Sequence, residues 1–93
     1  MAVTTLQVTQ TGSAVSVAAT GTYARWVIFQ DNAGHSARIG DASVSATRGV
    51  SLAQSGGSLT LQPMPDSAHY DLGQWSTLGT NADLLDVIYD AMK

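Results

Sequence analysis

Few side chains in this sequence are candidates for chemistry, and the two histidines come first. His35 lies in a polar segment that is predicted to be a turn, and its spacing to serines and carboxylates defines no nucleophile with a base. His69 and Asp71 would share one face of an extended segment with Asp66 nearby, and three such donors could hold a divalent cation. This segment lacks the repeated Asp, Asn and Gly spacing of a calcium loop. We therefore favour a polar connection over a metal site.

Other polar motifs are better explained as turns than as catalytic groups. Asp31 and Asp41 each stand next to residues that favour turns, where a carboxylate accepts hydrogen bonds from nearby backbone N–H groups. The run Ser55-Gly56-Gly57 is no phosphate cradle, because no helical pattern follows it. The sequence contains no cysteine, which excludes a disulfide framework and a thiolate metal site. We expect no enzyme, no catalytic residue and no cofactor.

Charge limits the classes of partner. The formal net charge is −3, with only four Lys and Arg residues in total. Binding to nucleic-acid phosphates needs several clustered cations, so a nucleic-acid partner is not expected. No apolar run is long enough to cross a bilayer, and the N-terminus lacks the pattern of a signal peptide, so we expect no membrane partner and a cytoplasmic site of synthesis.

The apolar residues predict a mainly β protein. Ninety-three residues suffice for one domain, residues 1–93. The densest apolar block, residues 26–29, is rich in aromatic and β-branched residues and indicates a central strand. Residues 58–62 alternate strictly, which predicts a covering strand with one apolar face. The candidate core or interface anchors are Trp26, Ile28, Leu59, Leu61 and Trp75.

Local patterns suggest how neighbouring strands pair. Residues 3–9 and 14–20 are predicted to form a hairpin or two adjacent strands, with residues 1–12 as an alternative N-terminal arm or edge strand. Residues 35–39 are expected to pair with residues 25–30 as a second hairpin, and residues 72–78 follow as a later strand. Residues 84–89 fit a helix or a strand, and the β context favours the strand.

Seven or eight short strands at spacings of about ten residues are typical of a small antiparallel sandwich or barrel. We predict a jelly-roll-like or Ig-like sandwich. In such a small fold, subunit contacts would add to the burial that one chain can achieve.

The stretch from Arg38 to Ala53, with the turn Gln54-Ser55-Gly56-Gly57 and the strand after it, resembles a family of small tailed-phage virion proteins. The matching block is Ile39-Gly40-Asp41, then Val44-Ser45-Ala46-Thr47, Gly49 and Leu52, and Leu72-Gly73-Gln74-Trp75 matches a later "Leu-x-x-aromatic" pattern. The likeness spans residues 22 to 90, and its motif is structural, not catalytic.

The resemblance implies a non-enzymatic structural protein of the virion. The leading interpretation is a capsid decoration, or cement, protein that is assembled in the host cytoplasm and binds the outer surface of the head in many copies. Its partners would be the major capsid protein and sister copies, with a homo-trimer favoured. The candidate contacts with capsid or sister copies lie in the N-terminal segment and in residues 42–49: Val3, Thr5, Leu6, Val8, Ser43, Val44, Thr47 and Arg48.

Two alternatives remain open at the level of sequence. One is a neck, tail or baseplate component of the virion with a similar β-domain. The other is a carbohydrate-binding β-module in which Trp75 and Tyr70 are exposed as a sugar platform.

Overall fold

The computed structural model describes residues 3–63 and 68–91, and this part of the chain is built from strands. It contains no α-helix, and one turn of 3₁₀ helix, η1 (Leu72–Gln74), interrupts the strands. No helix in these residues is long and apolar enough to cross a membrane. The strands are β1 (Val3–Thr9), β2 (Val15–Ser16), β3 (Tyr23–Asp31), β4 (Ala37–Gly40), β5 (Val50–Leu52), β6 (Gly57–Leu61), β7 (Tyr70–Asp71), β8 (Ser76–Leu78) and β9 (Leu84–Ala91).

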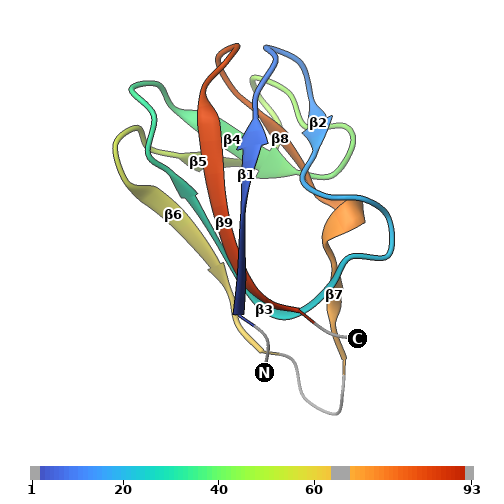
Figure 1. The fold of residues 1–93 in the computed structure, drawn as a ribbon. Coiled ribbons are helices and arrows are strands. Elements are labelled where there is room, and N and C mark those ends of the chain that lie inside the picture. Colours follow the sequence, from blue (N-terminus) through green and yellow to red (C-terminus); the bar gives the residue numbers. More distant parts are fainter. Residues whose placement is uncertain (1–2, 64–67, 92–93) are drawn as a thin grey trace.

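The strands form two antiparallel sheets that pack as a sandwich (Figure 1). One sheet has five strands in the order β1-β9-β3-β6, with β7 also paired to β3, and the other has four strands in the order β2-β8-β4-β5. The mainly β fold class and the antiparallel sandwich are therefore as predicted.

The path of the chain is one long hairpin that has been rolled up. β1 pairs with β9, β2 with β8, β3 with both β6 and β7, and β4 with β5. Rolling brings β3 against β9 and β4 against β8, which completes the sheets. This winding is that of a jelly roll. The tip of the long hairpin is the segment between β4 and β5, residues 41–49, hereafter the tip loop.

This winding overturns the local pairings predicted from the sequence. β1 and β2 lie in different sheets, so residues 3–9 and 14–20 make no hairpin. β4 likewise leaves the sheet of β3 and pairs with β5 and β8. In both places the chain crosses from one sheet to the other, because each strand finds its partner in the distant arm of the long hairpin.

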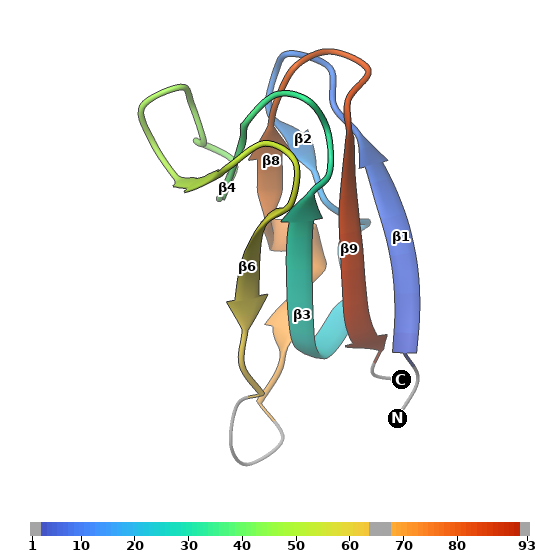
Figure 2. The same ribbon diagram turned by 90° about the vertical axis from the view of Figure 1, so that its left-hand side faces the viewer.

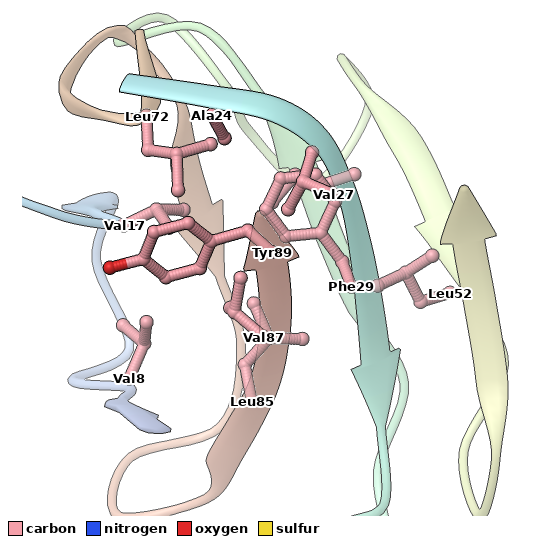
Figure 3. Packing of buried hydrophobic residues seen from close by; sticks show 11 residues of the cluster. Val8, Val17, Ala24, Val27, Phe29, Leu52, Leu72, Leu85, Val87 and Tyr89 are labelled. Carbon is pink, nitrogen blue, oxygen red and sulfur yellow. The ribbon is translucent and has the colours of Figure 1, made fainter. Parts of the chain in front are cut away.

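The core lies between the sheets and draws on both (Figure 3). Phe29 and Val27 of β3 point into it together with Leu85, Val87 and Tyr89 of β9. The second sheet and the connections supply further buried apolar residues, among them Val17, Ile39, Leu52 and Leu72.

Two of the predicted anchors do not belong to this core. Along β3 the inward residues are Ala24, Val27 and Phe29, whereas Trp26 and Ile28 are half-buried on the opposite side of the sheet. A β-bulge between Ala24 and Val27 lets both of these residues face the core although they are three positions apart. The other predicted anchors, Leu59, Leu61 and Trp75, are half-buried and pack against the core.

The C-terminal strand is confirmed and the strand at residues 72–78 is only partly correct. β9 runs over Leu84–Ala91 and buries Leu85, Val87 and Tyr89 on one face, as the alternation predicted. Residues 72–74 instead form the 3₁₀ turn η1, because the Asp71 carboxylate accepts a hydrogen bond from the N–H of Gly73 at 2.9 Å and caps the turn. Only Ser76–Leu78 continues as strand β8.

Candidate functional site

The tip loop is an irregular segment that is held by several hydrogen bonds, and it contains the middle of the family-like block, whose ends lie on β4 and β5. Oδ1 of Asp41 accepts hydrogen bonds from the backbone N–H of Ser43 at 2.9 Å and from its hydroxyl at 2.6 Å. Ser45 and Arg48 exchange backbone hydrogen bonds of 3.1 and 3.2 Å and close a tight turn. The guanidinium of Arg38 on β4 donates to the carbonyl of Gly49 at 2.8 Å. These bonds give the exposed loop a defined shape.

Close packing explains why the block has valine at position 44 and glycine at position 49. Val44 is buried, 6% exposed, beneath its own loop. Gly49 adopts φ = +113°, and a Cβ there would lie 2.8 Å from both the carbonyl oxygen of Ile39 and Cγ2 of Val44. The close packing of valine, glycine and β4 therefore requires glycine.

The tip loop presents three of the four contact residues that the sequence assigned to it. Ser43, Thr47 and Arg48 are exposed, and the guanidinium of Arg48 donates to the Ser43 hydroxyl at 3.3 Å. Val44 is a correction, because its side chain is buried and offers no surface to a partner. Figure 2 shows the loop extending sideways from the body of the sandwich.

The candidate contact residues of the N-terminal segment also divide into exposed and buried ones. β1 forms the edge of the five-stranded sheet beside β9 (Figure 2). Val3 and Thr5 are exposed and point away from the core, whereas Leu6 is half-buried against it. Val8 is 7% exposed and belongs to the core cluster, so its assignment as a contact residue is corrected.

The side of the five-stranded sheet away from the core, here called the outer face, carries an ordered set of side chains. Cross-strand register aligns Thr5, Ile88, Ile28 and Thr60 in one row from β1 to β6. The next row holds Gln7, Asp86, Gln30 and Ser58. In this second row the Gln7 amide donates to Asp86 at 2.8 Å, and Asn32 donates to the other oxygen of Asp86 at 2.6 Å.

The histidines and their neighbours have structural partners. Nδ1 of His35 lies 2.9 Å from Oδ2 of Asp83, an ion pair when the histidine is protonated, across a separation that the sequence could not reveal. The ring of His69 packs edge-on against Tyr23 with 4.6 Å between centroids. Oδ1 of Asp71 accepts hydrogen bonds from the N–H groups of Gly21 and Gly73. Asp66 lies outside the described residues, and within them no group of three His, Cys, Asp or Glu side chains could hold a metal ion.

The aromatic platform suggested for a sugar is not exposed. Trp75 is half-buried and packs on Phe29, with ring centroids 5.6 Å apart. Tyr70 is also half-buried, and its hydroxyl donates to the carbonyl of Gln62 at 2.7 Å. A shallow depression beside Trp75 is lined by Gly40, Asp41 and Gln74. Neither ring is fully exposed, and carbohydrate binding stays a prediction.

Sequence reasoning missed two buried polar residues, Gln10 and Asp31. Gln10 is 1% exposed, and its Oε1 accepts a hydrogen bond from the Thr77 hydroxyl at 3.1 Å. Asp31 is fully buried at the end of β3, where Oδ1 accepts from the N–H of Ala33 and Oδ2 has no hydrogen-bond partner. The sequence signal for Asp31 was its place in the inward parity set by Val27 and Phe29.

The pKa values of the two turn aspartates, Asp31 and Asp41, are shifted in opposite directions. Burial raises the pKa of Asp31 above its ordinary value of 3.8, and the nearby charge of Asp83 adds to the increase. The hydrogen bonds from the Ser43 hydroxyl and N–H lower the pKa of Asp41 below 3.8. Asp41 is thus held as a carboxylate that orders the tip loop, whereas ionised Asp31 opposes folding.

Comparison with known proteins returns no assignment: no protein-family model, curated protein or solved structure matches this chain. A functional assignment must therefore come from the surfaces described above.

Proposed function

We propose that this chain is a non-enzymatic structural protein of a tailed-phage virion, and that it decorates and stabilises the head. The observation that carries the proposal is the tip loop. Residues 41–49, the middle of the block that resembles the virion family, form one largely exposed loop, and hydrogen bonds within it and from Arg38 fix its shape. A loop that is already ordered loses little conformational entropy when it binds.

The mechanism would be burial of preformed surface against the major capsid protein. Ser43, Thr47 and Arg48 supply hydroxyls and one cation on the exposed side of the tip loop. Many copies on a repeating lattice would each clamp adjacent capsid subunits. The jelly roll is also used by proteins of unrelated function, so the fold adds only analogy, and the proposal depends on the loop.

A neck, tail or baseplate position is the second candidate, because the same loop could serve any of these assemblies. Copy number separates the two positions. Quantitative mass spectrometry of purified particles would count this chain against the major shell protein. We expect a ratio near parity or a simple fraction of it. A ratio far below that would move the protein to the neck or tail, and its absence from particles would refute a virion role.

Charge substitution in the tip loop tests the contact surface. Thr47→Glu adds a negative charge at an exposed position of the loop, and Ser58→Glu adds the same charge at an exposed position of β6 on the other sheet. In a sedimentation assay with shells that lack this protein, Thr47→Glu should weaken binding by roughly tenfold or more, as expected for a mismatched charge at an interface. Ser58→Glu should bind like the parent. Equal binding by both variants would exclude the tip loop as the contact surface.

A further inference from the structure

The four edge strands of the sandwich differ in length, and β1 is the longest. The five-stranded sheet ends in β1 on one side and β6 on the other, and the four-stranded sheet ends in β2 and β5. β1 has seven residues, whereas β6 has five, β5 three and β2 two. In the described part of the chain no strand pairs with β1 on the side away from β9.

β1 also lacks the features with which proteins protect an exposed edge. Charged side chains, proline, bulges and shortness all discourage a second strand from adding to an edge. The β1 sequence, VTTLQVT, contains no charge and no proline, and its pairing with β9 runs over all seven residues without a register shift. β6, in contrast, starts at Gly57 and is followed closely by Pro63.

We propose that β1 is a self-association surface, which pairs antiparallel with β1 of a second copy of this chain around a twofold axis at Leu6. This register pairs all seven residues: Leu6 faces Leu6 of the other copy, Thr5 faces Gln7, Thr4 faces Val8, and Val3 faces Thr9. The two five-stranded sheets become one continuous sheet across the axis.

Parity and burial both fit this register. Thr4, Leu6 and Val8 lie on the core side of β1, and Val3, Thr5, Gln7 and Thr9 lie on the outer face. Pairing residues whose numbers sum to twelve places core-side residues opposite core-side residues, as continuous sheets require. Leu6, which is only half-buried in the single chain, would be covered by its symmetry mate.

The absence of charge favours a second copy as the occupant. A twofold interface brings a patch against itself, so any charge near the axis would meet an identical charge. β1 carries none, although the whole chain has a net charge of −3. The inference concerns the isolated chain and does not depend on a virion function.

Light scattering coupled to size exclusion tests the pairing on the full-length chain. We expect the mass of two 9.6 kDa chains at micromolar concentration. Thr5→Lys with Gln7→Lys places lysines opposite each other twice across the axis, and should raise the dissociation constant by roughly tenfold or more. The matched control is Thr60→Lys with Ser58→Lys, which puts the same charges in the same two cross-strand rows at the β6 edge. It should stay dimeric.

Cysteine cross-linking fixes the register, since the chain has no cysteine of its own. Neighbouring residue pairs in an antiparallel ladder alternate between close and wide spacing. Either Leu6→Cys alone, or a mixture of Thr5→Cys and Gln7→Cys chains, should therefore form a disulfide-linked dimer on mild oxidation. Thr60→Cys should not.

Three results would overturn the inference. They are a parent chain with the mass of one or three subunits, equal loss of the dimer in the β1 and β6 lysine variants, and cross-linking of Thr60→Cys in place of the β1 cysteines. Circular dichroism of each variant would verify that the β1 lysines dissociate folded chains and do not unfold them.

Discussion

The two sheets of the sandwich are stabilised by different means. In the five-stranded sheet, β3 and β9 are nine and eight residues long, and their inward side chains form most of the apolar core. The four-stranded sheet has strands of only two to four residues. It relies in addition on polar bonds and on close backbone packing, such as the Thr77 hydroxyl donating to the Arg38 carbonyl at 3.0 Å and Gly49 against Ile39.

This contrast suggests that the two sheets contribute to the stability of this very small domain in different ways. Apolar burial in the long strands supplies the driving force for folding, because buried apolar area is the dominant favourable contribution. Short strands bury less, so the second sheet depends on specific hydrogen bonds and on glycines. The tip loop, our candidate contact surface, projects from this second sheet, and the β1 edge belongs to the first.

The largest effect should come from the core of the five-stranded sheet. Phe29→Ala removes a fully buried ring and should lower the free energy of unfolding by about 3–5 kcal/mol. That is a large part of the roughly 5–15 kcal/mol that stabilises a typical domain. Urea unfolding followed by circular dichroism measures it. Trp26→Ala, on the outer face, should cost less, and a greater loss for Trp26 would contradict the assignment of β3 parity.

A smaller effect should come from backbone packing in the four-stranded sheet. Gly49→Ala forces a Cβ to within 2.8 Å of the Ile39 carbonyl oxygen at a positive φ, and should cost about 1–3 kcal/mol. Gly56→Ala is the control, because Gly56 has a similar φ of +122° but open space around the added Cβ. It should cost only about 1 kcal/mol, from the unfavourable φ. If the two variants unfold at the same urea concentration, crowding against β4 contributes nothing.

The smallest effect concerns the buried carboxylate of Asp31, at the end of β3. Because the pKa of Asp31 is raised above 3.8 in the folded state, its protonation favours folding. This contribution to stability should grow as the pH falls from 7 toward 3.8, and should be complete below 3.8. Asp41, whose pKa is lowered, acts in the opposite sense, and its contribution is lost only as the pH falls below 3.8.

Asp31→Asn should remove the first of these slopes. Urea unfolding at several pH values between 4 and 7 compares the variant with the parent. At pH 7 the variant should be at least as stable as the parent, since the asparagine oxygen can still accept from Ala33 and no buried charge remains. An unchanged pH dependence in Asp31→Asn would show that another group is responsible.

Strand content could be predicted from the sequence because alternation is a local property. The parity of residues 85, 87 and 89 predicted the inward face of β9, and the turn composition of residues 42–48 predicted a loop. The bulge at Arg25 and Trp26 could not be predicted in this way. One extra residue shifts the parity of the residues before it, so Ala24 faces the core although simple alternation from Val27 would turn it outward.

The sequence by itself determined that this protein is mainly β, with short strands typical of a small sandwich or barrel, that the tip loop is polar, and that β1 carries no charge. Each of these follows from side-chain type and spacing along a few residues. Only the tertiary structure decided which strands pair, because β1 meets β9 and β2 meets β8 across nearly the whole chain. It alone placed Asp83 against His35 and left β1 at an edge. Such long-range pairings are selected by the burial of a shared core, so they cannot be predicted from the local sequence.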